Sequence, residues 1–349
     1  NPNDFADAKE VYNWNADFVL LTVAVCREAL AHAGLEMDAD TAPRTACLVG
    51  SALNGMDAFR VAMDNYVNKG PLKVSPYLLP NLCANLPAGK AGMALKFSGP
   101  IFSPQGACAS GNYAVGLGAR MIRDGDCDFV LAGGVDTSLV PEIIHGFENM
   151  NATIKILPGD RAHDDAGQAS RPFSIDRKGF VLSEGAGVLV LAPEEKLSLY
   201  GLKPKAEVLG VGWSSDAYHF TRPNPDTVTR AIREAIDDAG LAPEDIQYVN
   251  THGTSTPRGD SMEVACLKRV FGGHLEKMPI SSNKSQIGHT LGGAAAIEGA
   301  LSIEAMQRGV ILPTINHIPD PAFEGIDVVP NETRKMAHEL FLSNAFGFG

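Results

Sequence analysis

A nine-residue pattern occurs twice in this chain, roughly 200 residues apart. Residues 27–35 read REALAHAGL and residues 233–241 read REAIDDAGL. In both copies apolar residues recur with helical period, and the next-to-last residue of each copy is Gly, the usual residue just after a helix. An acidic linker, a short apolar run and a loop of small residues follow both copies. One short match can arise by chance, but the shared order of elements predicts two related α/β halves in one chain.

Other segments fit the same α/β class. Apolar runs bordered by Gly predict buried strands at residues 129–134 and 187–192. Helical periodicity predicts three helices, at residues 113–123, 228–239 and 294–307. We expect the first half to span residues 1–195 and the second half to span residues 196–349.

Charge and cysteine content exclude several classes of protein. The formal net charge is -12 and no run of Lys or Arg occurs, so a nucleic-acid partner is not expected. No apolar stretch reaches the roughly 18 residues of a membrane span, and no signal peptide opens the chain. Six Cys without a paired CxxC spacing indicate a reduced, cytoplasmic protein rather than a disulfide frame or a zinc site. Because the chain starts at Asn1 without Met, we expect a preceding segment.

Cys108 is the first candidate for chemistry. It lies in the segment QGACASG, directly ahead of a predicted helix. A free thiol is only about 3% thiolate at pH 7, and the partial positive charge of a helix N-terminus favours the anion. Lowering the pKa by about one unit would raise that fraction to roughly a quarter. A lone Cys is more often buried and inert, and we assign that role to the other five: Cys26, Cys47, Cys83, Cys127 and Cys266.

Two histidines follow predicted strands in the second half. His252 opens a loop of small hydroxyl residues, and His289 shares a loop with Lys284. A buried cation beside an imidazole keeps the ring neutral, and a neutral ring can donate one N–H to an oxyanion. Glu298, in the next helix, could balance Lys284. Taken alone, His252 is better explained as a structural His, and the segment of Lys284 and His289 could be a capping loop with a solvated Lys.

The chain closes on SNAFGFG, a Gly-broken aromatic loop that contains Phe346. An ordinary turn that packs two Phe side chains into the core would give the same pattern. The loop is informative only together with the Cys108, His252 and Lys284–His289 segments, which it follows in a fixed order.

These four segments, in this order, resemble the β-ketoacyl-acyl-carrier-protein synthase family, most of all its elongating bacterial type II branch. The resemblance covers nearly the whole chain and includes four further motifs, at residues 170–177, 179–182, 184–187 and 215–219. It implies a thiolase-like α/β fold, in which two duplicated halves form a five-layered αβαβα stack. It also implies a dimer.

The resemblance assigns roles to eleven residues. Cys108 matches the nucleophile, and His252 and His289 match the catalytic pair. Lys284 and Glu298 match supporting charges. Phe346 matches a gating Phe whose backbone N–H joins that of Cys108 in the oxyanion hole. The remaining matches are Thr254 and Thr256, which resemble residues that bind the pantetheine arm, and Leu53, Phe147 and His219, which fall at or near positions of the acyl pocket and its gate.

The implied reaction is a decarboxylative condensation of a Cys108-bound acyl group with malonyl-acyl-carrier-protein, in fatty-acid or polyketide/polyene elongation. The enzyme would be an acyltransferase with no metal and no resident cofactor, because phosphopantetheine on an acyl carrier protein carries the substrates. Expected partners are that carrier and a second subunit. The pair would be a homodimer, or a heterodimer with a subunit that resembles a chain-length factor.

Several positions depart from the family pattern. Residues 11–15 lie where relatives often carry Arg or Lys for carrier docking, and Asn151 stands where an Arg is common. Residues 151–169 form a longer polar segment than usual, which predicts an exposed excursion. These departures favour a specialised polyketide or polyene pathway.

Three alternatives remain at this point. A non-catalytic subunit of the chain-length-factor kind would replace the nucleophile, whereas Cys108 and both His are present. A thiolase acting on coenzyme A esters needs a second, late Cys, and the one late Cys of this chain is Cys266, inside a predicted helix. A structural scaffold would not need the Cys, His and Lys set.

Overall fold

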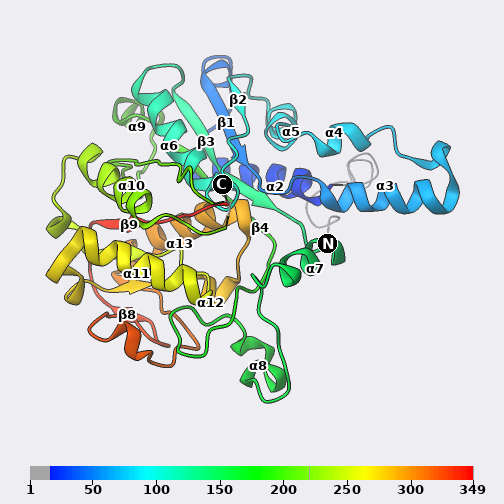
Figure 1. The fold of residues 1–349 in the computed structure, drawn as a ribbon. Coiled ribbons are helices and arrows are strands. Elements are labelled where there is room, and N and C mark those ends of the chain that lie inside the picture. Colours follow the sequence, from blue (N-terminus) through cyan, green and yellow to red (C-terminus); the bar gives the residue numbers. More distant parts are fainter. Residues whose placement is uncertain (1–15, 220, 349) are drawn as a thin grey trace. The chain divides into compact units, whose positions relative to one another are not determined.

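The computed structural model describes residues 16–219 and 221–348, which belong to two compact units (Figure 1). The first unit takes Asn1–Ile143, Ser183–Pro204 and Thr290–Ala300, and the second takes Ile144–Leu182, Lys205–His289 and Leu301–Gly349. The units therefore interleave along the chain, whereas the sequence suggested one cut between residues 195 and 196. That division into halves stays a prediction. Residues 11–15 lie outside the described residues.

The first unit is built on a four-stranded sheet of order β2-β1-β3-β4. Its strands are β1 (Thr45–Gly50), β2 (Ile101–Phe102), β3 (Phe129–Asp136) and β4 (Gly185–Leu191). β1 runs parallel to β2 and β3, and β4 runs antiparallel to β3. β3 and β4 approach so closely that a Cβ on Gly133 would lie 1.9 Å from the Gly187 carbonyl oxygen. Only glycine fits at that position.

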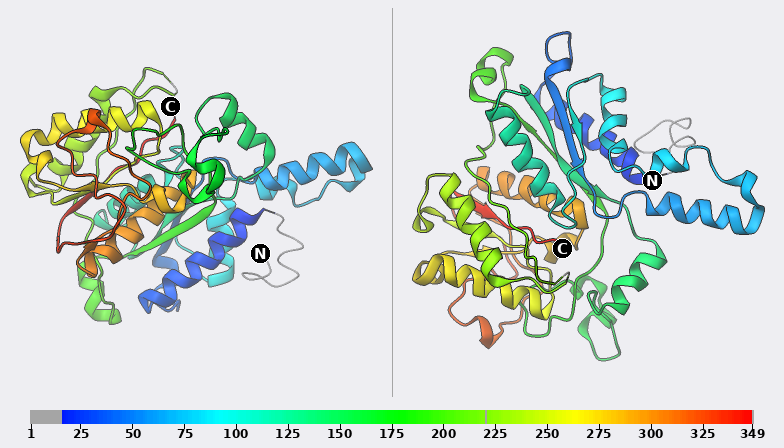
Figure 2. Two further views of the ribbon diagram at one scale, coloured as in Figure 1. Left: turned by 90° about the horizontal axis from the view of Figure 1, so that it is seen from below. Right: turned by 45° about the horizontal axis from the view of Figure 1, so that its top comes forward.

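Helices cover both faces of this sheet, because successive strand residues point to opposite sides. Cys47 and Val49 pack with α2 (Asp17–Ala33) and α5 (Leu86–Leu95). Ala46 and Leu48 pack instead with α6 (Ser110–Arg123). The first unit is thus a three-layered α/β/α structure (Figure 2).

A helical extension leaves this sheet after β1. It contains α3 (Met56–Lys69) and α4 (Leu78–Leu82), and Figure 1 shows α3 reaching away from the sheet of its own unit. The exposed large apolar side chains of α3 are Phe59, Val61, Met63, Tyr66 and Val67. The other helices that begin in this unit are α7 (Pro141–Asn149), α9 (Glu194–Tyr200) and α13 (Ala294–Gln307).

The second unit has a three-stranded parallel sheet of order β6-β5-β9. Its strands are β5 (Tyr248–Asn250), β6 (Ile280–Ser281) and β9 (Phe341–Ser343). α10 (Pro225–Asp238) and α11 (Pro257–Phe271) pack on one face, around Val249 and Ile280. Tyr248 lies on the other face in a smaller cluster with Ile311 and Val329. The unit also holds α8 (Arg161–Asp164), α12 (Lys284–Ile287) and a hairpin of β7 (Val310–Ile311) and β8 (Arg334–Lys335).

The repeated pattern of the sequence has a structural counterpart in each unit. The first copy forms the end of α2 and precedes β1, and the second copy forms the end of α10 and precedes β5. Gly34 and Gly240 have φ of 71° and 68°, the left-handed conformation that favours glycine after a helix. The predicted strands and helices are confirmed to within a few residues as β3, β4, α6, α10 and α13. The excursion after Asn151 is confirmed as largely exposed.

One assignment from the sequence was wrong. Cys83 was expected to be buried, but it is exposed at the end of the short helix α4. Cys83 has apolar neighbours in the sequence, which suggested burial. In this helical extension, however, several apolar side chains are themselves exposed to solvent. Across the described parts of the chain, no helix has both the length and the apolar character needed to cross a membrane.

Candidate active site

Cys108 sits on a strained turn immediately before α6. Ala107 has φ 48°, which is uncommon for a residue with a side chain. The Ser110 hydroxyl holds the turn closed, since it accepts from the Gly106 N–H at 3.1 Å and donates to the Ala107 carbonyl at 2.7 Å. Cys108 itself is 8% exposed. The turn therefore fixes one thiol at the start of a helix, as the sequence predicted.

His252 follows β5 and is held through its backbone by a buried carboxylate. The N–H groups of His252 and Gly253 each donate to Glu263 on α11, at 2.8 Å. The Asn344 side-chain amide donates to the same carboxylate at 3.1 Å. Because Asn344 lies two residues before Phe346, Glu263 links the His252 loop to the loop that carries Phe346.

The two predicted histidines lie against each other. Their ring centroids are 5.4 Å apart and the ring planes are nearly perpendicular. The Phe346 ring contacts His252 at 5.3 Å, and the Phe180 ring contacts His289 at 5.2 Å. Phe147 extends this row of rings, 5.3 Å from Phe180. The second unit thus places both imidazoles in contact with each other and with aromatic side chains on either side.

Both imidazoles are neutral at physiological pH. Burial is the main cause that lowers the pKa of His252 and of His289 well below 6.5, and the positive charge of Lys284 lowers both further. Lys284 is 1% exposed at the start of α12. Among residues 16–219 and 221–348, neither Nδ1 atom of the two histidines has a hydrogen-bond partner. The neutral form expected from the sequence follows from this geometry.

Three residues of this region were not identified from the sequence: Phe180, Asp260 and Glu263. Burial raises the pKa of Asp260 to about 7, and its carboxylate accepts the Phe173 N–H at 2.8 Å. Burial also raises the pKa of Glu263, against the hydrogen bonds that favour its charge. A signal was available: the two acids are three residues apart, on the apolar face of α11 that carries Val264 and Leu267.

The remaining predicted residues divide between the units. In the second unit, the Thr254 and Thr256 hydroxyls lie 3.0 Å apart, and His219 accepts the Thr221 N–H at 3.1 Å. In the first unit, Leu53 follows β1 and Glu298 is buried on α13. Cys108 also belongs to the first unit, whereas His252, Lys284, His289 and Phe346 belong to the second. Their joint action in one reaction stays a prediction.

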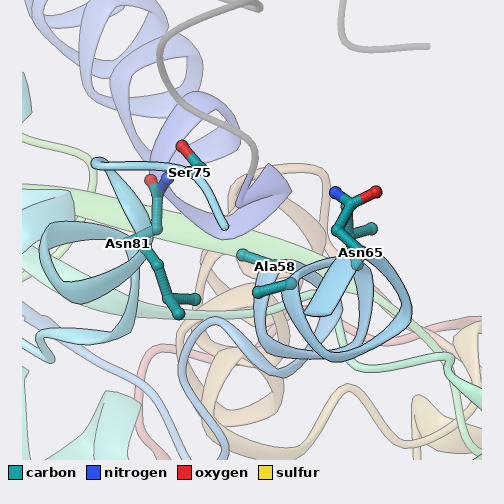
Figure 3. A pocket seen from close by; sticks show the side chains of 7 residues that line it. Ala58, Asn65, Ser75 and Asn81 are labelled. Carbon is teal, nitrogen blue, oxygen red and sulfur yellow. The ribbon is translucent and has the colours of Figure 1, made fainter. Parts of the chain in front are cut away.

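A small pocket lies elsewhere, between α3 and α4 of the first unit (Figure 3). Its lining is mostly apolar, with Asn65, Ser75 and Asn81 as the polar members. No residue predicted to act in catalysis lines it. Among the described residues, no group of His, Cys, Asp and Glu side chains has the arrangement of a metal site.

Comparison with known proteins assigns the chain to a family. The family model for the beta-ketoacyl synthase N-terminal domain matches residues 15–196, and that for the beta-ketoacyl synthase C-terminal domain matches residues 205–317. The chain belongs to the beta-ketoacyl synthase family. A 3-oxoacyl-[acyl-carrier-protein] synthase 2 of Coxiella burnetii is 38% identical over 335 residues, which cover 95% of this chain and 79% of that protein.

Solved structures of ketosynthases share the fold of this beta-ketoacyl synthase. The ishigamide ketosynthase/chain length factor has a TM-score of 0.89 at 31% identity, covering 100% of this chain and 83% of its own. A ketosynthase bound to the hexaketide, in complex with its type II polyketide acyl-carrier protein, has a TM-score of 0.89 at 26% identity, covering 96% of this chain and 83% of its own. The predicted family, thiolase-like fold and acyltransferase class are confirmed.

Proposed function

We propose that this chain extends a Cys108-bound acyl group by decarboxylative condensation with a malonyl thioester. The observation that carries the proposal is the pair of neutral imidazoles beside the buried Lys284. Two uncharged N–H donors in a desolvated site suit an enolate oxygen, because such donors stabilise charge that develops during the reaction. The turn that presents Cys108 supplies the nucleophile.

The first half-reaction transfers the acyl group. The Cys108 thiolate attacks the carbonyl carbon of an acyl thioester, and the carbonyl oxygen becomes an oxyanion. The backbone N–H groups of Cys108 and Phe346 are the proposed donors to that oxygen. Collapse of the tetrahedral intermediate breaks the bond to the carrier sulfur, which leaves as a thiolate and takes a proton from solvent.

The second half-reaction forms the new carbon–carbon bond. The malonyl carboxylate leaves as carbon dioxide, and its bonding electron pair moves onto the thioester as an enolate. His252 and His289 each donate an N–H to the enolate oxygen, and losing one such donor typically costs about 3–4 kcal/mol. The enolate carbon then attacks the Cys108 thioester carbonyl and releases the Cys108 thiolate. This scheme balances without a metal or an oxidant.

The substrates are proposed to arrive on the phosphopantetheine arm of an acyl carrier protein. Thr254 and Thr256 would bind that arm, and their adjacent hydroxyls fit a chain of amide groups. Leu53, Phe147 and His219 would border the acyl chain, and Glu298 would balance Lys284. The relatives support a carrier-bound substrate, since one is a 3-oxoacyl-[acyl-carrier-protein] synthase and another is a ketosynthase in complex with its acyl-carrier protein.

A second subunit is also proposed. The exposed apolar side chains of α3 form the kind of surface that another protein covers. The partner is a second copy of the chain, or a subunit resembling the chain length factor of the ishigamide ketosynthase. We place the enzyme in the cytoplasm, because the six cysteines are all free thiols. Light scattering of the purified chain, alone and with such a subunit, tests the pairing.

Intact-mass measurement tests the function directly. The enzyme is incubated with a panel of acyl carriers, and we expect one acyl group on the wild type and none on Cys108→Ala. Adding malonyl carrier should then release carbon dioxide and the extended product. His289→Ala should still be acylated and should release carbon dioxide more slowly. If no acyl group loads on the wild type, the synthase function is wrong.

A polyketide or polyene pathway is favoured over housekeeping fatty-acid synthesis. Asn151 supports it, because the family resemblance implies a carrier-docking Arg at that position, and here a neutral side chain is exposed. Of the two solved ketosynthases compared above, one is paired with a chain length factor and the other is in complex with a type II polyketide acyl-carrier protein. Titration against two carriers distinguishes the pathways, and tight preference for the housekeeping fatty-acid carrier would contradict this one.

A further inference from the structure

Asp136 is a buried carboxylate that accepts four hydrogen bonds from two separate segments of the first unit. It is the last residue of β3 and is 0% exposed. One oxygen accepts from the Ser51 hydroxyl at 2.7 Å and the Leu53 N–H at 3.1 Å. The other accepts from the Ala52 N–H at 2.9 Å and the Gly292 N–H at 2.6 Å.

Burying the Asp136 carboxylate costs free energy of desolvation. Within residues 16–219 and 221–348, no Lys, Arg or His forms an ion pair with Asp136, so three backbone N–H groups and one hydroxyl balance its desolvation. A buried charge without a nearby cation is not expected to stabilise the fold by itself. The segments that it joins suggest what it is for.

One of those segments leads to the nucleophile. Ser51 also accepts the Asn54 N–H at 2.9 Å, and the Asn54 side-chain oxygen accepts from the Gln105 amide at 3.0 Å. Gln105 opens the turn that carries Cys108. Asn54 has φ 53°, so the loop after β1 is held in an uncommon backbone conformation. A continuous chain of hydrogen bonds therefore runs from Asp136 to the Cys108 turn.

The other segment is the turn that starts α13. Gly292 lies so close to the carboxylate that a Cβ there would be 2.7 Å from the Asp136 side chain and 2.7 Å from the Ala52 nitrogen. Leu291 has φ 47°, an uncommon conformation for a residue with a side chain, and the Gly292 N–H that follows donates to the Asp136 carboxylate. The fit is specific to Asp, since Glu would move the carboxylate by about 1.5 Å, one carbon–carbon bond.

We propose that Asp136 is a positioning residue of the condensing reaction, which sets the loop from Ser51 to Asn54 and, through Gln105, the turn of Cys108. This inference rests on the proposed function. It assigns Asp136 no contact with substrate. Its effect appears in the rate at which bound donor transfers its acyl group, because small displacements of a nucleophile slow a reaction by one to two orders of magnitude.

The test is single-turnover acylation of Cys108 by a carrier-free donor, the octanoyl thioester of N-acetylcysteamine, followed by intact mass. We expect Asp136→Asn to slow acylation at saturating donor by about tenfold or more, with little change in the donor concentration for half-maximal rate. The matched control is Leu131→Val, a buried change five residues earlier in β3. It should lower the melting temperature without slowing acylation.

Ser51→Ala keeps the experiment decisive if Asp136→Asn does not fold. It removes the link to Asn54 and leaves three donors on Asp136, so acylation should slow by a smaller factor. The double variant should be no slower than Asp136→Asn alone, because both changes break one chain of contacts. Wild-type rates in Ser51→Ala, or in folded Asp136→Asn, overturn the inference. Failure of the wild type to load any acyl group overturns the proposed function instead.

Discussion

At the scale of the residue, the charge of Lys284 adds to burial in lowering the pKa values of the two histidines. Burial lowers the pKa of His252 and His289 first, and the Lys284 charge lowers them further. In Lys284→Met both pKa values should rise toward 6.5, so the rings protonate at a higher pH than in the wild type. An imidazolium beside the malonyl carboxylate would stabilise the charge that must be lost. The acid limb of malonyl decarboxylation should therefore move to higher pH, measured as a pH–rate profile.

Lys284→Arg is the matched control, because it keeps the positive charge. Its profile should follow the wild type, even if the larger side chain lowers the maximal rate. Identical acid limbs in Lys284→Met and the wild type would show that the Lys284 charge does not act on the histidines.

The residues of the site were predictable to different degrees. Cys108, His252, Lys284 and His289 each stand in a short motif beside a strand or helix end, so the order of these motifs was enough to propose them as candidates. Their joint role in one reaction stays a prediction. Glu263 could not be recognised as easily, because its partners are the backbone of His252 and the Asn344 side chain, 81 residues away. Its role is created by the packing of α11 under two strand ends.

At the scale of the element, α11 fixes the ends of β5 and β9 through Glu263. Glu263→Gln keeps the shape of the side chain but replaces one acceptor oxygen with a donor, against N–H groups that must donate. Leaving a buried donor unpaired costs about 1–3 kcal/mol. We expect that loss of unfolding free energy in urea, together with slower malonyl decarboxylation, because the His252 and Phe346 loops lose their common anchor.

Glu234→Gln provides the comparison on a neighbouring helix. Glu234 lies on α10, where it forms a half-exposed ion pair with Arg230. Changes at such surface pairs fall within about 0.5 kcal/mol. Equal losses of unfolding free energy in the two variants would show that Glu263 stabilises the fold no more than an exposed acid does.

The elements were predictable where periodicity is strong, and much less so where tertiary contacts decide. α2 and α10 carry regular apolar spacing and a terminal Gly, and the strands that follow them are apolar runs. β9 has only three residues and was not predicted; it exists because it pairs with β5. The interleaving of the two units was also hidden, since residues 290–300 join the first unit through contacts with β3 and β4 rather than through any local signal.

At the scale of the whole molecule, the resistance to acid depends on groups whose pKa values moved in opposite directions. His252 and His289 bind protons less readily in the folded protein, so they favour unfolding as the pH falls below about 6.5. Asp260, with its pKa raised to about 7, works the other way: its cost to stability disappears as the pH falls from about 7 toward 3.8. These contributions to the pH dependence of the unfolding free energy offset one another. A single carboxylate outside this group therefore gives a clearer test of how ionisation affects stability.

Asp160 is such a probe, because its hydrogen-bonded ion pair with Arg171 anchors the exposed segment after Asn151. The two side chains are 2% and 0% exposed and 2.7 Å apart. Asp160→Asn leaves the buried guanidinium without its counter-charge. We expect a loss of about 3 kcal/mol of unfolding free energy, the lower end for a buried pair because half-exposed Lys178 shares the carboxylate.

The contribution of Asp160 depends on pH, because Arg171 holds the pKa of this carboxyl well below 3.8. The stabilisation by the ion pair is complete above about pH 3.8 and is lost as the pH falls further. In urea denaturation the gap between wild type and Asp160→Asn should hence stay constant from about pH 8 to 5 and narrow below about 4. Glu304→Gln, at an exposed helical pair with Arg308, should show almost no gap at any pH, and an equally small gap for Asp160→Asn would refute the anchoring role.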